Sequence, residues 1–262
     1  MTRVVAGSSI AVLAAPAAWH WTQLSSLALL AACGGGSGDE TLDSALNECQ
    51  PRQLMSLEVG SSYQVRMTQE GFPDATVTIE SIVAPAVPFA GKPLTRQIVS
   101  WTSVFPGGSR SLIDRQVSTS YVERAERGLV RELGRDHEQS GDFGSGRSVR
   151  TVFDPAIVDA SFTLARGQSL TRTTRGLVTT TGSTATPSPF EQVDTVRFED
   201  RVSLTINGKT YDTCRFAVAQ EGEVSSRSWH HVGTGIPIRI ENYGAPPRSL
   251  EMRLLVVNGE EI

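Results

Sequence analysis

The stretch Arg201–Gln220 reads RVSLTINGKTYDTCRFAVAQ, and its pattern decides the fold class of the chain. Apolar and polar residues alternate along Val202–Ile206, and they alternate again along Lys209–Gln220 after the Asn207-Gly208 pair. A period of two residues is typical of a β-strand with one buried face. Asn-Gly is the favoured pair for a two-residue type I′ turn. The stretch therefore predicts an antiparallel hairpin.

The same alternation recurs along most of the chain after Pro51. The expected strands share apolar residues at every second position and boundaries near Gly, Pro or Asn. They are Ser62–Gln69, Ala75–Val83, Arg96–Phe105, Leu112–Val122, a strand beginning at Leu129, Ser148–Phe153, Val224–Val232 and Leu250–Val257. The expected strands recur about every ten residues, which predicts a mainly β fold, arranged as an antiparallel meander, a half-barrel or a sandwich. A short helical turn at Thr41–Gln50 is the most helix expected, and Gly134–Gly146 and Thr181–Pro189 are expected to be loops.

The first 32 residues have the layout of a bacterial signal peptide. Arg3 is their only acidic or basic residue, and two apolar stretches follow, Ile10–Ala18 and Leu24–Ala32. A membrane-spanning helix needs about 20 mainly apolar residues, and Pro16 and the polar break at Trp19–Gln23 interrupt the run. A short apolar run that ends in small residues predicts a leader that is removed, residues 1–32.

Cys33 ends the motif Leu30-Ala31-Ala32-Cys33 and precedes a Gly/Ser-rich run. This motif resembles the lipobox of bacterial lipoproteins, in which the cysteine is lipidated and becomes the first residue of the mature chain. The resemblance implies acyl chains on Cys33, and two such anchors already hold a protein stably at a membrane. Gly34 in place of an aspartate implies the outer membrane, facing the periplasm. The alternative is an unmodified thiol beside a flexible segment.

This reading divides the chain into a signal peptide at residues 1–32, a lipidated tether at 33–50 and a single β-rich domain at 51–262. Two cysteines remain after lipidation, Cys49 and Cys214. An oxidising compartment favours a disulfide between them, and Cys214 shares its strand face with Phe216 and Val218. The chain-entropy model gives a bridge over such a long loop about 4–5 kcal/mol of stabilisation. The alternative is two unrelated free thiols.

The polar groups of the sequence form no catalytic or metal motif. Neighbouring residues of an extended chain point to opposite sides, so the Asp-His-Glu run at 136–138 does not converge on one substrate. Gly144-Ser145-Gly146 lacks the spacing of a nucleophile elbow. His230 and His231 are adjacent on an expected strand, so one points inward and one outward, and a metal needs further ligands. We expect no catalytic site, no metal and no cofactor.

The net charge of −4 becomes −5 once Arg3 is removed with the leader. A mildly acidic chain attracts phosphates poorly, which argues against nucleic-acid binding.

Three C-terminal pieces form a further pattern: the strand Val202–Ile206, the run Thr210–Phe216 with its Tyr-Asp-Thr-Cys core, and Trp229 followed by the Gly-x-Gly turn Gly233–Gly235. The pattern resembles uncharacterised β-rich lipoproteins of proteobacterial envelopes. More remotely, it is similar to envelope β-proteins with a half-barrel like that of lipoprotein-localisation factors, which bind acyl chains. The resemblance implies an architecture and transfers no catalytic residue.

Together these features predict a lipid-anchored cell-envelope protein without a catalytic site that binds an amphiphile or a protein partner. An anchored structural or assembly component that acts through protein contacts alone is the alternative, and an envelope hydrolase is least favoured. The expected partners are the membrane, through acyl chains on Cys33, and a protein or lipid ligand.

Overall fold

The computed structural model describes residues 49, 57–107, 110–125, 129–142, 146–180, 186–244 and 247–262. The signal peptide, Cys33, the tether and the helical turn expected at Thr41–Gln50 lie outside these residues, with the exception of Cys49. Within the described ranges, no helix has the length and apolar character needed to cross a membrane.

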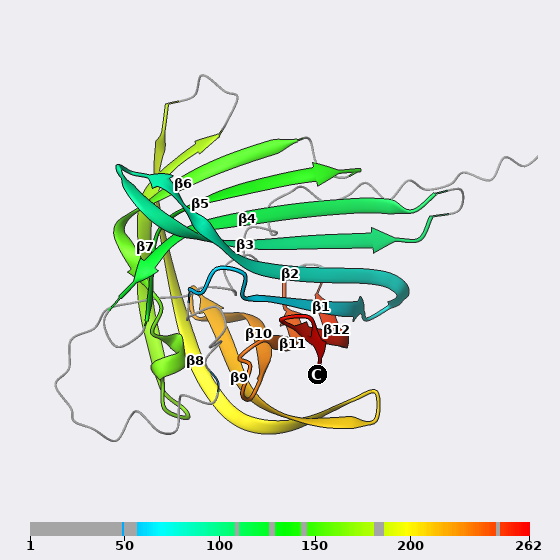
Figure 1. Ribbon diagram of the computed structural model, residues 1–262. Coiled ribbons are helices and arrows are strands. Elements are labelled where there is room, and N and C mark those ends of the chain that lie inside the picture. Colours follow the sequence, from blue (N-terminus) through cyan, green and yellow to red (C-terminus); the bar gives the residue numbers. More distant parts are fainter. Residues whose placement is uncertain are drawn as a thin grey trace, which may run out of the picture.

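The described residues form one antiparallel sheet of 13 strands that follow one another in chain order (Figure 1). A single 3₁₀ turn, Ser161–Thr163, lies between β6 and β7. The strands are β1 Ser62–Gln69, β2 Phe72–Phe89, β3 Lys92–Phe105, β4 Leu112–Arg124, β5 Val130–Gly141, β6 Arg147–Val158, β7 Ser169–Thr180, β8 Ser188–Ile206, β9 Lys209–Gln220, β10 Glu223–His231, β11 Pro237–Asn242, β12 Arg248–Val257 and β13 Glu260–Glu261.

The sheet closes on itself because β1 pairs with β12 as well as with β2. Val65, for example, lies opposite Ile79 of β2 on one side and opposite Leu255 of β12 on the other. The short β13 pairs with the last two residues of β12, Val256 and Val257, and takes no part in closing the ring. The predicted mainly β antiparallel meander is therefore confirmed. The half-barrel and the sandwich do not form, because pairing between the first and last long strands removes the open edges that both would have.

Closure gives the sheet an inner face and an outer face. Buried residues occupy alternate positions of β1, Tyr63, Val65 and Met67, and these positions point inward. An exception on the outer face is Tyr121 of β4, which is buried beneath Phe89 with ring centroids 4.0 Å apart. We call the apolar cluster on the inner face of β1, β2, β3, β11 and β12 the apolar sector. Its residues are Tyr63, Val65, Met67, Val77, Ile79, Val83, Val99, Ile236, Ile238, Ile240, Leu250, Met252, Leu255 and Val257.

A second apolar cluster fills the inner side of β8 and β9. Phe162 from the 3₁₀ turn packs against Phe216 of β9 with ring centroids 5.3 Å apart, and Phe198 of β8 stacks on Phe216 at 5.0 Å. Leu164 joins the same cluster. The connection between β6 and β7 therefore folds back into the barrel and covers this part of its wall.

The β8–β9 hairpin has the turn that its sequence predicts. Asn207 and Gly208 both adopt positive φ angles, 50° and 79°, as a type I′ turn requires. The hairpin extends beyond β10, whose pairing with β9 ends at Thr213, and it curves below β10, β11 and β12 (Figure 1). Asn207 Nδ2 donates to the Met252 carbonyl of β12 at 3.4 Å, and Ile206 joins the apolar sector. The hairpin thus reaches past two short strands, β10 and β11, to contact β12.

The expected loop at Gly134–Gly146 is wrong for its first part, because β5 continues to Gly141. Asp136 pairs with Thr119 of β4 and with Arg150 of β6. Ladder pairing on both sides overrides the local composition. In the second expected loop, Thr181–Pro189, residues 181–185 lie outside the description and β8 begins at Ser188.

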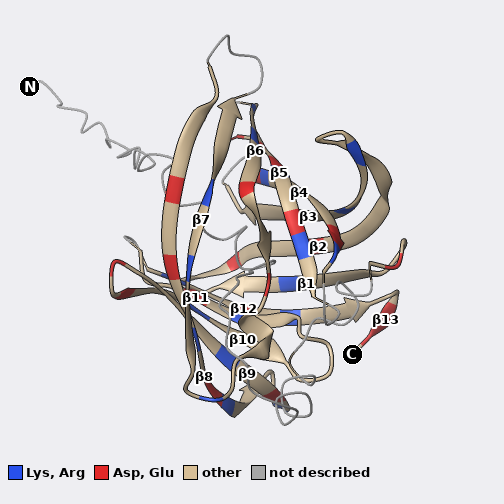
Figure 2. Cartoon of the chain, turned by 90° about the vertical axis from the view of Figure 1, so that its left-hand side faces the viewer, with Lys and Arg blue, Asp and Glu red and all other residues tan. Residues whose placement is uncertain are grey.

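Charged residues of both signs are distributed along the strands (Figure 2), and many of them pair on the outer wall. Arg175 and Glu191 form an ion pair there at 2.7 Å, as do Arg239 and Glu241. Exposed pairs of this kind stabilise a fold by about 0–1 kcal/mol. These ion pairs show that the outer wall presents charged side chains at its surface.

The position of Ile206 predicts a large stability loss on truncation. Ile206→Ala removes a fully buried side chain and is expected to lower the free energy of unfolding by about 2–5 kcal/mol, measured by urea denaturation. Leu177→Ala on the outer wall of β7, where the side chain is 49% exposed, serves as the control and should cost less than about 1 kcal/mol. Equal losses in the two variants would mean that the hairpin does not pack into the barrel.

Candidate functional site

Polar side chains continue the inner wall beyond the apolar sector. Ser118 of β4 lies between Val99 of β3 and His137 of β5, and His137 lies next to Val149 of β6. Residues that pair across strands share a face of the sheet, so these side chains line the inside of the barrel. We call this part of the inner wall the polar sector. Its residues are Asp114, Gln116, Ser118, Ser120, Arg135, His137, Gln139 and Arg147.

Asp114 is the buried carboxylate of the polar sector, with 5% of its surface exposed. Gln116 Nε2 donates to one of its oxygens at 3.1 Å, and Gln139 Nε2 donates to the other at 3.2 Å. Both donors are neutral amides. The hydrogen bonds hold the carboxylate in place without cancelling its charge.

Asp114 interacts electrostatically with His137 and with Arg248. Burial lowers the pKa of His137, and the charges of Arg135 and Arg147 lower it further, while Asp114 acts in the opposite direction. Burial likewise lowers the pKa of Arg248, and Asp114 raises it. Arg248 begins β12, and β1, β2 and β3 lie between that strand and β4 in the ring, so its charge acts on Asp114 from another part of the wall.

Two other sets of charged groups on the inner wall form closed pairs. Arg135 donates two hydrogen bonds to Glu132, at 2.8 and 2.9 Å. On β7 and β8, Arg172 pairs with Asp194 at 3.1 Å, and both side chains are buried. These pairs are neutral overall and belong to the structure of the wall. Arg147, in contrast, is exposed at the start of β6.

Two hydroxyl groups of the inner wall are buried without a hydrogen-bond partner among the described residues. They are Ser118 Oγ and Ser81 Oγ. Ser118 is 6% exposed, and both serines lie opposite Val99, one on each side of β3. A buried hydroxyl without a partner costs about 1–3 kcal/mol. The wall therefore offers hydrogen-bonding capacity that the described protein groups do not use.

The inner side of β6 and β7 is less densely packed than that of β1. Val149, Thr151 and Phe153 of β6 are all partly exposed, whereas the inward residues of β1 are buried. Phe153 meets Phe190 of β8 edge to face at 6.3 Å. The polar sector therefore borders apolar side chains that the described residues do not fully cover.

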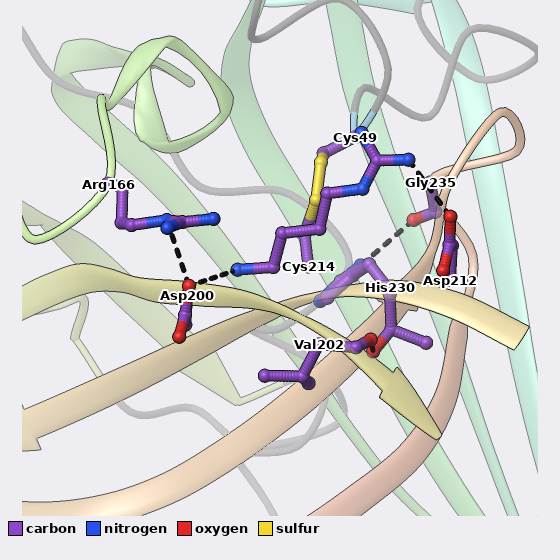
Figure 3. The surroundings of a disulfide bond; sticks show 10 residues. Cys49, Arg166, Asp200, Val202, Asp212, Cys214, His230 and Gly235 are labelled. Atoms are coloured by element: carbon purple, nitrogen blue, oxygen red, sulfur yellow. Dashed lines mark hydrogen bonds and ion pairs between the residues drawn. A yellow bond between two sulfur atoms is a disulfide. The ribbon is translucent and has the colours of Figure 1, made fainter. Parts of the chain in front are cut away.

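Cys49 and Cys214 are joined by a disulfide, the bridge that the cysteine pattern predicts (Figure 3). Their Cα atoms are 6.1 Å apart, within the usual range. Cys214 is fully buried on the inner face of β9, and Cys49 lies in the same apolar cluster. The bridge ties a residue that precedes β1 to the inside of the barrel. Beside the bridge, Arg166 and Asp200 form an ion pair in which Nε and Oδ1 are 2.8 Å apart.

His230 lies opposite Cys214 on the neighbouring strand and points inward, as one of the two neighbouring histidines was predicted to do. Its Nδ1 atom is 2.9 Å from the Gly235 carbonyl (Figure 3), and its Nε2 atom is 2.9 Å from Ser228 Oγ. A carbonyl only accepts, so Nδ1 carries the proton and Ser228 donates to Nε2. Burial lowers the pKa of His230 to about 4, so the ring is neutral at pH 7.

His231 points to the other side of the strand and is half-buried, with Nδ1 3.0 Å from Thr234 Oγ1. The prediction that the two histidines face opposite ways is confirmed. The bond between Ser228 and His230 was not predicted, although residues two apart on a strand share a face and their spacing could have indicated it. Ser228 and His230 are both buried, and the rings of Phe162 and Phe216 lie 5.5 and 5.4 Å from His230. This arrangement supports a structural role, since a nucleophile needs access to its substrate.

The Asp-His-Glu run separates as predicted. Asp136 points outward, where it accepts from Tyr121 Oη at 2.7 Å and binds Arg150 in two hydrogen bonds. His137 points inward to the polar sector. Within the part of the chain that the structure describes, no three His, Cys, Asp or Glu side chains are placed to hold a metal ion.

Comparison of the chain with protein-family models, with curated proteins and with solved structures finds no match. The site is therefore interpreted from its own geometry and chemistry.

The burial of His230 predicts a specific pH dependence of stability. Its pKa is about 4 in the folded chain and about 6.5 in the unfolded chain. The unfolded state therefore binds the extra proton first, and stability is lost as the pH falls from about 6.5 towards 4. Between pH 7 and pH 4.5 the loss from this residue is expected to be about 2–3 kcal/mol.

Urea denaturation of the native chain and of His230→Gln at the two pH values measures this contribution. Between pH 7 and pH 4.5, the free energy of unfolding of His230→Gln should fall by about 2–3 kcal/mol less than that of the native chain. His231→Gln, at the half-buried neighbour, is the control and should retain most of the native pH dependence. If His230→Gln and the native chain respond equally, the imidazole is not held neutral by burial.

Proposed function

We propose that the chain is a lipid-anchored cell-envelope protein whose barrel binds an amphiphile along its inner wall. One observation supports this above all. The apolar sector and the polar sector lie on the same inner face of one closed sheet. Ligand sites are mainly apolar with a few placed polar groups, and an amphiphile presents the matching combination of an apolar tail and a polar head.

Partly exposed apolar side chains on the inner wall also support the proposal. Val149 and Phe153 are apolar, point inward and are only partly covered by the described residues. The outer wall of the neighbouring strands carries ion pairs such as Arg150–Asp136 and Arg175–Glu191. An apolar tail inside the closed ring loses contact with water, and this burial contributes about 25 cal/mol per Å² of apolar surface.

The anchoring part of the proposal rests on Cys33 and its resemblance to a lipobox. Acyl chains on Cys33 would hold the barrel at the outer membrane, facing the periplasm and close to a supply of amphiphiles. The Cys49–Cys214 bridge suits the oxidising conditions of that compartment. Binding without catalysis is consistent with the buried Ser228–His230 pair and with the opposite directions of Asp136 and His137.

Native purification tests the proposal directly. The chain is isolated from the envelope in a mild detergent, and the molecules that remain bound are extracted and identified by mass spectrometry. We expect one class of amphiphile in near-stoichiometric amount, and an acylated Cys33 in the intact mass. Cys33→Ser should move the chain out of the membrane fraction.

A matched pair of variants on β6 locates the ligand. Val149→Gln changes an inward apolar residue, and Val152→Gln changes an outward one on the same strand. Val149→Gln should reduce the retained amphiphile several-fold, whereas Val152→Gln should leave it unchanged. Retention of a protein alone would favour the structural or assembly role instead. An unmodified Cys33 in the native chain would contradict the anchor.

A further inference from the structure

Side chains with hydroxyl or imidazole groups form a row across the inner wall. Tyr63 of β1 lies opposite Ser81 of β2. Val99 of β3 lies opposite Ser81 on one side and opposite Ser118 of β4 on the other, and His137 of β5 follows opposite Ser118. Residues that pair across strands share a face of the sheet, so these groups follow one another around the inside of the barrel. We call them the hydroxyl row.

The two serines of the hydroxyl row are buried without using their hydroxyl groups. Ser81 is 2% exposed and Ser118 is 6% exposed, and neither Oγ atom has a hydrogen-bond partner among the described residues. A hydroxyl both donates and accepts. Each serine therefore offers a donor and an acceptor to a group that the described part of the chain does not supply.

The ends of the row are neutral groups as well. Burial is the only cause that raises the pKa of Tyr63, so no charge or hydrogen bond from a described residue acts on its phenol. Burial is also the largest cause that lowers the pKa of His137, so its imidazole is neutral at pH 7. His137 points inward and is partly exposed, which makes this end of the row the accessible one.

Charges of both signs lie near His137, and their effects oppose each other. Arg135 and Arg147 lower its pKa, whereas Asp114 raises it. Arg135 is already bound to Glu132 through two hydrogen bonds. The charges of this wall therefore select neither an anion nor a cation, and hydrogen bonding to neutral groups is the basis for recognition here.

The spacing of the two serines indicates how far the polar part of a ligand extends. Ser81 and Ser118 lie on β2 and β4, with β3 between them. Neighbouring strands are about 4.8 Å apart, so the two residues lie roughly 10 Å apart along the wall. A single hydroxyl or amide cannot bond to both serines. Linked hydroxyl groups, as in a disaccharide, can do so.

An aromatic side chain borders the row. Trp101 lies two residues from Val99 on the same face of β3, opposite Gln116, and is partly exposed. Its ring has an apolar surface and one N–H donor. This combination suits a sugar, whose C–H groups pack on an aromatic ring while its hydroxyl groups bond to polar neighbours.

We propose that Ser81, Ser118 and His137 bind the uncharged, polyhydroxylated headgroup of a single-chain amphiphile, a sugar linked to one alkyl chain. This inference rests on the proposed function and names the ligand class of that site. Val149 lies next to His137 across the strands, and Phe153 lies further along the same face of β6. The tail lies along these two apolar side chains, so head and tail meet beside His137.

Calorimetry with four probes tests the inference on the full chain carrying Cys33→Ser, which has no acyl anchor. Octyl maltoside has a sugar head and a tail, octanol has the same tail with one hydroxyl, octanoate has an anionic head, and maltose is the head alone. Each probe that has a tail is titrated below its critical micelle concentration. We expect octyl maltoside to bind tightest and maltose weakest.

Ser118→Ala should narrow the preference for octyl maltoside over octanol about three- to tenfold, as the loss of one neutral hydrogen bond predicts. Ser81→Ala should act in the same direction. Because Ser118→Ala removes a buried hydroxyl without a partner, the ligand-free variant should be at least as stable in urea as the Cys33→Ser chain. Ser140→Ala makes the same change on the exposed outer face of β5, and should leave both the preference and the stability unchanged.

The possible failures differ. Equal affinity for octyl maltoside and octanol, or tighter binding of octanoate than of both, would overturn the headgroup inference and leave the proposed function standing. A less stable ligand-free Ser118→Ala would show that the fold itself uses this hydroxyl, with the same consequence. Binding of none of the three probes with a tail would overturn the proposed function itself. Binding of maltose as tightly as octyl maltoside would contradict an amphiphile ligand.

Discussion

The backbone pairing of β1 with β12 is the interaction on which the rest of the structure depends. It turns a meander of consecutive strands into a ring, so that alternate residues acquire an inside and an outside. Without it, β1 and β12 would be open edges, which invite pairing with other chains, and the apolar sector would lack its boundary. Tyr63, Val65 and Met67 are buried because Val257, Leu255 and Met252 lie beside them across this seam.

Two further contacts complete the ring. The β8–β9 hairpin crosses to β12, where Asn207 donates to the Met252 carbonyl and Ile206 enters the apolar sector. The Cys49–Cys214 bridge fixes the chain ahead of β1 to the inner face of β9. Both contacts join parts of the ring that are not sheet neighbours. The inner side of β4, β5 and β6 keeps partly exposed side chains and a Ser118 hydroxyl without a partner among the described residues, and the proposed ligand lies on this part of the wall.

Local signals in the sequence predicted the strands that have one apolar face. The ranges Ser62–Gln69 and Lys209–Gln220 match β1 and β9, and the Asn207-Gly208 turn has the expected φ angles. The loop predicted from Gly134 was wrong as far as Gly141, where β5 continues with Asp136 bound to Arg150 outside and His137 in the polar sector inside. A strand that is polar on both faces has no hydrophobic period to detect. Closure and the unpartnered Ser118 hydroxyl could not be predicted, because both depend on pairing between strands that the sequence does not specify locally.

Amide hydrogen exchange along β1, followed by NMR, tests ring closure most directly. In a strand with neighbours on both sides, successive amides bond alternately to one neighbour and to the other. The account predicts that every amide from Tyr63 to Arg66 is protected, because β2 lies on one side and β12 on the other. Protection at every second amide only, with fast exchange at those between, would show that β1 is an open edge and would contradict the closed barrel.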